Sequence, residues 1–281
     1  MPDSAPGASA PKETVPVGVD PTRASIARVY DAFLNGKDNY EIDRQVMYGV
    51  LKVAPEARDL ATENRNFLIR ACRFIAAETG IDQYLDCGSG LPTAENTHQV
   101  VQRFNPEATV VYVDNDPVVL AHGRALLEED ERSHLISADI FKPHEVIEHE
   151  LVQKTIDFTR PVALLQCGTL HHYNGPRAAP AEIMREYISL LPSGSYVVIS
   201  HFLDPEDEHS EVARKMEDVF VHSPMGSGTF RTSTELAELF DGLELVPPGL
   251  TRCADWWPDG PHLKPLSQAQ YCTAGAVGRK P

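Results

Sequence analysis

Short apolar runs alternate with helix-like segments through the middle of the chain. The runs lie at residues 84–86, 109–113, 134–139, 161–167 and 195–200, and each gives way to a polar residue or a glycine. The fourth run is almost continuously apolar, as are strands buried on both faces of a parallel sheet. Segments with helical spacing of apolar positions separate the runs, at residues 93–104, 117–129, 145–152 and 180–191. This alternation predicts an open, mostly parallel α/β sheet.

The pattern differs at the two ends of the chain. Residues 1–20 are rich in Pro, Ala, Gly and Ser, which predicts a flexible tail. Helical spacing then predicts three helices before the first strand, at residues 26–34, 41–53 and 57–79. We therefore expect a helical cover over residues 21–80 and a sheet domain over residues 81–281.

The end of the sheet domain differs from its middle. A charged segment (204–220) and a short helix (233–240) precede two more strands, at residues 243–246 and 269–276. No crossover helix separates these two strands, so one of them is expected to run antiparallel at the edge. The prediction is a seven-stranded sheet.

The first two strand ends carry residues suited to a nucleotide. The first strand runs into Asp86-Cys87-Gly88-Ser89-Gly90, and the second ends at Asp114. Glycines after a strand let the backbone approach a ligand, and the following helix offers unpaired N–H groups. A carboxylate that ends the second strand can accept hydrogen bonds from both hydroxyls of a ribose. We therefore predict a nucleotide site at the carboxyl ends of the strands.

The residues around the glycines favour S-adenosylmethionine over a dinucleotide. The dinucleotide fingerprint requires a third small residue, and Thr93 occupies that position. Asp86 would repel a pyrophosphate, whereas it suits the ammonium group of a methionine moiety. An NAD-dependent oxidoreductase is the alternative that both departures disfavour. The simplest alternative is an ordinary α/β domain with a tight glycine turn.

Composition narrows the range of partners. The formal charge of −16, with no Lys/Arg run, argues against nucleic acid, whose affinity depends on basic contacts. No apolar run approaches the length of a membrane span, and the first residues do not resemble a signal peptide. The five cysteines are scattered, as is typical of reduced thiols. We expect a cytoplasmic protein that acts on a small molecule without a metal, and the oligomeric state stays open.

Several long motifs resemble those of one known family. They lie at residues 25–39, 63–65, 88–93, 111–122, 241–249 and 256–260. The chain resembles the actinobacterial S-adenosylmethionine-dependent methyltransferase family long classed as a domain of unknown function. The resemblance runs from about residue 22 to the end, and it implies the Rossmann-like class I methyltransferase fold and S-adenosylmethionine binding. It implies no acceptor. The polar stretch at residues 166–174 departs from the family's apolar run, which predicts an acceptor site of its own.

Within such a fold, the strand ends have expected roles. Asp86 is predicted to bind the amino group of the methionine moiety, and Gly88 and Gly90 to bring the backbone against the cofactor. Asp114 is predicted to accept from the ribose hydroxyls, with Asn115 beside the adenine.

The third strand and the cover add to this set. Asp139 is predicted to accept from the adenine amino group, with Ile140 against the ring. Tyr30 and Lys37 flank a glycine-containing break between helices that we expect to fold over the cofactor. Lys37 or Arg65 would then meet the cofactor's carboxylate. A plain turn between helices is the alternative for this segment.

The end of the fourth strand is where methyl group and acceptor should meet. Gly168 is predicted to contact the cofactor there. His171, His172 and His201 are the candidate general bases, because imidazole titrates near neutral pH. A base is needed only for an acceptor that arrives protonated, and a hydrogen-bonded structural role is the alternative for each histidine. A binding protein without turnover is the alternative to an enzyme.

Overall fold

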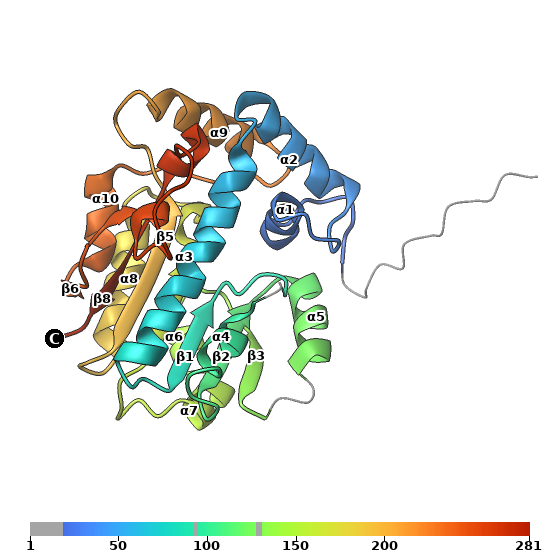
Figure 1. Ribbon diagram of the computed structural model, residues 1–281. Coiled ribbons are helices and arrows are strands. Elements are labelled where there is room, and N and C mark those ends of the chain that lie inside the picture. The colour runs from blue at the N-terminus through green and yellow to red at the C-terminus, as the bar shows by residue number, and fades with distance from the viewer. Residues whose placement is uncertain (1–18, 93–94, 128–130) are drawn as a thin grey trace, which may run out of the picture.

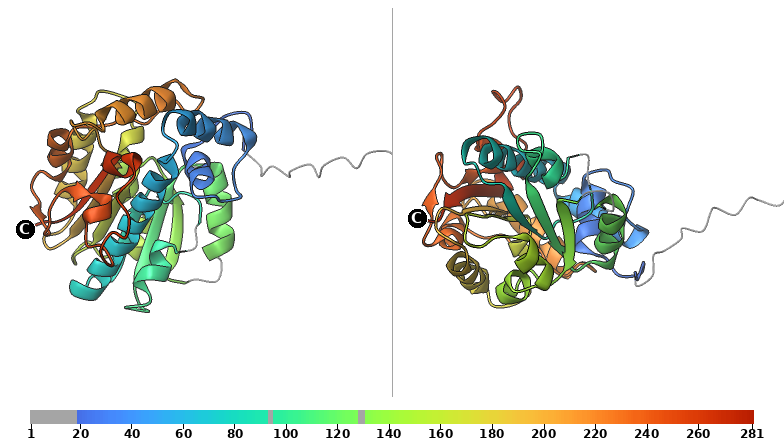
Figure 2. Two further views of the ribbon diagram at one scale, coloured as in Figure 1. Left: turned by 45° about the horizontal axis from the view of Figure 1, so that its top comes forward. Right: turned by 90° about the horizontal axis from the view of Figure 1, so that it is seen from below.

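The computed structural model describes residues 19–92, 95–127 and 131–281. The predicted tail therefore lies almost entirely outside the described residues, as do Thr93 and the expected helix end at Glu129. Figure 1 shows a twisted sheet with helices packed on both of its faces, and the right-hand view of Figure 2 shows the same layers from below. The α/β prediction is confirmed.

Eight strands form one sheet in the order β3-β2-β1-β4-β5-β8-β6, with β7 also pairing with β8. Their bounds are β1 Gln83–Cys87, β2 Thr109–Asp114, β3 Ser133–Ser137, β4 Ala163–Cys167, β5 Tyr196–Phe202, β6 Glu244–Leu245, β7 Thr251–Arg252 and β8 Thr273–Arg279. Strands β1 to β5 are parallel, and β8 runs antiparallel to β5. The strand order reverses between β1 and β4, and ligands of open α/β sheets bind at such a point.

The mostly parallel sheet with an antiparallel strand toward one edge is confirmed, but the count of seven strands is wrong. The missed strand, β7, has two residues, too few for any periodicity to show. The last strand also begins later than expected, because Gln268–Cys272 forms a 3-10 helix before it.

Ten α-helices are found in the described part of the chain. Their bounds are α1 Ile26–Phe33, α2 Glu41–Val53, α3 Ala57–Glu78, α4 Thr97–Val101, α5 Pro117–Leu127, α6 Pro143–Ile147, α7 Glu150–Thr155, α8 Ala179–Leu190, α9 Ser210–His222 and α10 Ser233–Ala237. The helix expected at 145–152 is divided, because the His149 side chain accepts from Leu151 N (3.2 Å) and caps α7. The helix expected at 93–104 is shorter, since α4 begins after the cap residue Asn96.

Three groups of buried apolar side chains hold the layers together. One packs α6 and α8 on one face of the sheet, and a second packs α3 and α4 on the other. Trp256 is fully buried in the second group, edge-on to Phe67 at 5.5 Å between ring centroids. The third group joins α1, α2 and α9, which Figure 1 shows beyond one end of the strands. Helices of this third group therefore lie over one end of the sheet.

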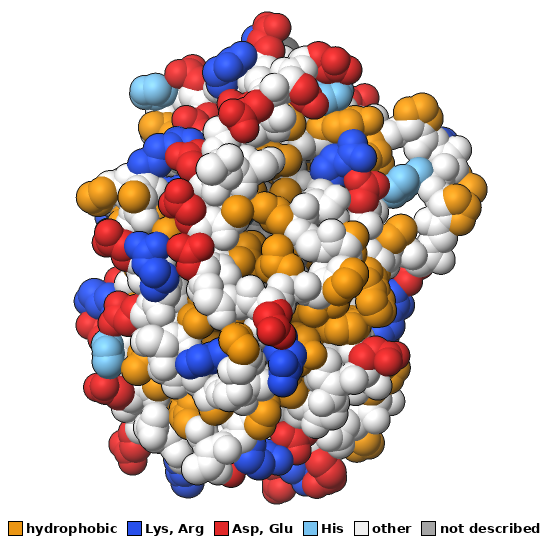
Figure 3. Space-filling view, turned by 90° about the vertical axis from the view of Figure 1, so that its left-hand side faces the viewer, with side chains coloured by type: hydrophobic (Ala, Val, Ile, Leu, Met, Phe, Trp, Pro, Cys, Tyr) orange, Lys and Arg blue, Asp and Glu red, His pale blue; other side chains and the backbone are white. Residues whose placement is uncertain are grey.

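The surface carries charges of both signs. On the face shown in Figure 3, acidic and basic side chains are intermingled, so the net charge of −16 is not gathered there. In the described ranges, no helix is both long and apolar enough to cross a membrane.

Candidate cofactor and acceptor site

A cavity of about 550 Å³ lies at the carboxyl ends of the parallel strands, between them and α1, α3 and α9. That volume is within the range of about 300–1,000 Å³ typical of small-molecule sites. Twelve of the predicted residues line it: Tyr30, Arg65, Asp86, Gly88, Gly90, Asp114, Asn115, Asp139, Ile140, Gly168, His171 and His172. Two predicted residues, Lys37 and His201, are not part of the lining.

An acid at the end of β1 lies beside a cation from α3. Asp86 is 5% exposed and accepts a hydrogen bond from Thr97 Oγ1 (2.6 Å), and its burial raises the pKa of the carboxyl above the ordinary value. Arg65 donates to the Glu95 carbonyl, while its buried Nε has no hydrogen-bond partner among the described residues. A free amino acid group carries one cation and one anion, so this pair of opposite charges fits it.

Asp114 holds the glycine loop in place. Its two carboxylate oxygens accept from Gly90 N and Asp116 N, each at 2.9 Å. Burial is the largest cause that raises its pKa to about 6. Each oxygen has a further lone pair, so the same carboxylate can still accept from a ribose. Asp139 is arranged alike at the end of β3, since its Oδ1 accepts from Phe141 N at 3.0 Å.

At two positions, close neighbours leave no room for a side chain larger than that of glycine. A Cβ on Gly88 would lie 2.3 Å from Thr169 Cγ2, and one on Gly168 would lie 2.9 Å from Asn64 Nδ2. Both have positive φ, 76° and 72°, which favours glycine. Gly90 differs, because no atom of the described residues lies within 4 Å of the position of its Cβ. Gly90 also lines the cavity, so a ligand can contact the backbone there.

A hydrogen-bond network that the sequence analysis missed crosses the cavity wall. Asn64 Nδ2 donates to Tyr30 Oη (3.0 Å), which in turn donates to the Ala61 carbonyl (3.0 Å). Asn64 Oδ1 accepts from Ser200 Oγ at the end of β5. Asn64 lies in a motif that the sequence analysis noted, residues 63–65, but its partner is 136 residues away. The network connects α1 and α3 to the sheet beside Gly168.

The motif around Lys37 shapes a turn. Asp31, 7% exposed, accepts from Asp38 N (3.0 Å) and from Asn39 Nδ2 (2.7 Å). Asp38 also lies 3.7 Å from His122 Nε2 on α5. These contacts leave Lys37 exposed and outside the cavity lining. Of the two cations predicted to meet the cofactor's carboxylate, only Arg65 reaches the cavity.

The three predicted histidines lie side by side, with ring centroids of His171 4.3 Å from His172 and 5.2 Å from His201. His201 Nδ1 donates to the Phe202 carbonyl (2.7 Å), so its Nε2 accepts from Arg231 Nη1 (2.9 Å). Both nitrogens of His201 are therefore engaged, and the ring is 1% exposed. His201 holds Arg231 and is not part of the cavity lining.

His171 and His172 line the cavity but differ in their hydrogen bonds. Phe202 N donates to His171 Nδ1 (3.4 Å), so the neutral ring carries its proton on Nε2 and can donate there. His172 Nδ1 pairs with Ser227 Oγ at 3.0 Å, in the loop after α9. Burial lowers the pKa of His171 well below its ordinary value and that of His172 to about 3. Both rings are neutral at pH 7.

The comparisons with known proteins agree with this geometry. The family model described as S-adenosyl methyltransferase matches residues 12–281. The chain belongs to the S-adenosyl methyltransferase family. Similar solved structures include a candidate methyltransferase from Thermobifida fusca, 41% identical over 94% of this chain and 98% of that one, with a TM-score of 0.88. A DUF574 family protein from Streptomyces avermitilis is 34% identical over 92% and 98%, with a TM-score of 0.85. No curated protein matches.

This S-adenosyl methyltransferase family member is therefore an S-adenosylmethionine-dependent methyltransferase with the class I fold. The predicted family, cofactor and enzyme class are confirmed. The oxidoreductase alternative gains no support from the family.

Proposed function

We propose that the protein transfers the methyl group of S-adenosylmethionine to a small-molecule acceptor bound in the 550 Å³ cavity. The observation that carries this is one cavity that brings together an acid, a cation, a glycine loop and two neutral histidines. When bound, S-adenosylmethionine supplies an electrophilic methyl group on a positively charged sulfur. The protein's own contribution is to hold the two reactants in line and away from water.

The cofactor half of the cavity has one polar group for each part of S-adenosylmethionine. Asp86 binds the ammonium and Arg65 the carboxylate, since these are the opposite charges beside β1. Asp114 accepts from the ribose hydroxyls while it fixes Gly90. The remaining strand-end residues, Asn115, Asp139 and Ile140, surround the adenine. Lys37 has no role in this arrangement, because the Asp31 turn keeps it outside.

The acceptor half contains one histidine suited to remove a proton. His172 is neutral and lines the cavity, and Ser227 Oγ can accept from its Nδ1–H, which leaves Nε2 as the basic nitrogen. His171 has its proton on Nε2 and serves as a hydrogen-bond donor to the acceptor. Of the three predicted bases, we therefore retain His172.

The helical section at residues 21–80 acts as the cover. Helix α1 and the first half of α3 supply cavity residues, among them Tyr30, Phe33 and Leu60. The Asn64 contact with Ser200 fastens this cover to the end of β5. The five cysteines are all free, which supports the reducing compartment that we predicted.

Calorimetry with S-adenosylhomocysteine tests the site. We expect the wild type to bind it with micromolar affinity, and Asp114→Ala to bind it about 100-fold more weakly, equivalent to about 2.7 kcal/mol. Asp82→Ala is the matched control, because that carboxylate lies before β1 and outside the cavity. Equal affinity in wild type and Asp114→Ala would contradict the proposal, as would no binding by folded wild type.

A further inference from the structure

The two halves of the cavity differ sharply in charge. Its lining includes five charged side chains: Arg65, Asp86, Asp114, Asp116 and Asp139. The four acids lie at or just after the ends of β1, β2 and β3, and Arg65 interacts with Asp86. Every charge of the lining therefore belongs to the cofactor half.

The acceptor half is apolar. Its wall contains the side chains of Phe33, Leu60, Phe202, Met216, Phe220 and Met225. All six belong to the hydrophobic group that joins α1, α2 and α9. Met216 is fully buried, and Phe33, Leu60 and Phe220 are each 6% exposed or less. A ligand that fills this half must give up most of its water.

The aromatic rings present a flat-sided surface. Phe202 stacks on His171 at 3.5 Å between centroids with 12° between the planes, and on Phe220 at 5.5 Å with 17°. The two methionines have flexible, polarizable side chains that adapt to the shape of an aromatic ligand and make favourable contacts with its ring. Rings and thioethers together suit a planar molecule better than a branched or polar one.

The polar groups of this half are neutral. His171 and His172 are uncharged at pH 7 because burial lowers the pKa of both, and Ser227 is the side-chain partner of His172. These groups can exchange hydrogen bonds with a hydroxyl. None of them can neutralise a carboxylate, phosphate or ammonium, and an unpaired charge in such surroundings costs several kcal/mol.

From this lining we infer that the methyl acceptor is an uncharged aromatic small molecule that carries a hydroxyl group. The inference rests on the proposed function, because it assigns the cofactor to the charged half. The aromatic body lies against the phenylalanine and methionine wall, and the hydroxyl meets the two histidines.

Three probes that share the naphthalene ring system test the inference by calorimetry on the S-adenosylhomocysteine complex. They are 2-naphthol, the anion 2-naphthoate and the cation 2-naphthylmethylammonium. We expect naphthol to bind at least about tenfold more tightly than either ion, because only the ions lose water without gaining a counter-charge. A wild type that prefers either ion would overturn the inference. So would a wild type that binds S-adenosylhomocysteine but binds no naphthol at millimolar concentration.

A charge placed in the wall sharpens the test. Met225→Lys adds a cation to the acceptor half, so the preference for naphthol over naphthoate should fall at least about tenfold. Val221→Lys is the matched control, since Val221 lies close by in sequence but is 40% exposed, and the preference should not change. The same ratio in both variants would overturn the inference. A wild type that binds no S-adenosylhomocysteine would instead contradict the proposed function, so the two failures differ.

Discussion

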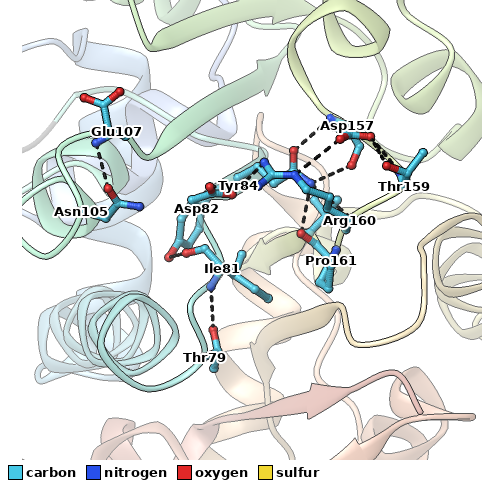
Figure 4. Close-up of polar contacts among 12 residues, drawn as sticks. Thr79, Ile81, Asp82, Tyr84, Asn105, Glu107, Asp157, Thr159, Arg160 and Pro161 are labelled. Carbon is cyan, nitrogen blue, oxygen red and sulfur yellow. Dashed lines mark hydrogen bonds and ion pairs between the residues drawn. The ribbon is translucent and has the colours of Figure 1, made fainter.

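Gln83 and Asp86 lie three residues apart on β1, at its amino and carboxyl ends. At the amino end, Gln83 Nε2 lies within hydrogen-bond distance of the carbonyls of Asp157, Arg160 and Pro161 (2.8–3.2 Å), and its Oε1 accepts from Asp157 N (2.9 Å). Figure 4 shows these neighbours gathered around the start of the strand, with Arg160 reaching Asp82. At the carboxyl end, Asp86 has one hydrogen-bond partner among the described side chains, Thr97, and lines the cavity.

The difference shows that polar groups at one end of the sheet stabilise the fold, whereas those at the other end are available to a ligand. Polar groups at the amino end satisfy each other, so nothing is left for a ligand. At the carboxyl end the carboxylates keep free lone pairs, and Arg65 on α3 keeps an N–H with no partner among the described residues. Burial raises the pKa of Asp86 and Asp114 there. Parallel strands bring their carboxyl ends to the same side, so several incompletely satisfied groups meet there.

The largest effect on stability should come from the amino end. Gln83→Leu keeps the volume but removes four contacts from a 2% exposed side chain, so unfolding should become easier by about 2–4 kcal/mol. Affinity of the folded variant for S-adenosylhomocysteine should stay within about twofold, because the cavity is at the other end. Urea unfolding and calorimetry measure the two quantities. A large loss of affinity without loss of stability would break the comparison.

Substitution of the glycines at the carboxyl end should mainly reduce the affinity for S-adenosylhomocysteine. Gly88→Ala puts a methyl group against Thr169 and strains a positive φ, so S-adenosylhomocysteine affinity should fall about 100-fold. Gly90→Ala is the matched variant, because it has the strained φ of 65° without a clash, and its loss should be about tenfold. Thr169→Ser in the Gly88→Ala background should recover part of the affinity by removing the methyl group that clashes. Equal losses in both alanine variants would show that the clash is unimportant.

Protonation of Asp114 at low pH should stabilise the fold but weaken cofactor binding. Its pKa is about 6 when folded, against an ordinary 3.8, so the folded chain takes up the proton first as pH falls. The free energy of unfolding of wild type, relative to Asp114→Ala, should therefore rise by about 1 kcal/mol between pH 7.5 and 5. Affinity for S-adenosylhomocysteine should fall about tenfold over the same interval, because a protonated carboxyl accepts fewer hydrogen bonds. Parallel changes in the two quantities would contradict this assignment.

The smallest effect should come from the exposed pair at the amino end. Arg160 contacts both oxygens of Asp82 at 3.0–3.1 Å, but its side chain is 52% exposed. Arg160→Ala should change the free energy of unfolding by less than about 1 kcal/mol. Urea unfolding at low and high salt checks this, and a loss above about 2 kcal/mol would mean that the pair organises the turn around Gln83.

How well the sequence predicted each part depended on the length of the signal. The parallel strands were found because short apolar runs of two to four residues alternate regularly with segments of helical spacing. The turn at residues 148–149 was missed because helical spacing continues across it, and only the His149 cap interrupts the helix. The two-residue β7 was missed because its pairing with β8 leaves no local pattern.

The sequence by itself determined the sheet, the glycine loop and the acids at the strand ends, because strand periodicity and turn chemistry act between neighbouring residues. Only the tertiary structure decided which candidates meet. It turned Lys37 outward through the Asp31 turn, engaged both nitrogens of His201, and paired Asn64 with Ser200. It also built the uncharged wall of the cavity from side chains as far apart in the chain as Phe33 and Met225. Such contacts depend on how helices pack across the sheet, and residues far apart in the chain carry no local record of it.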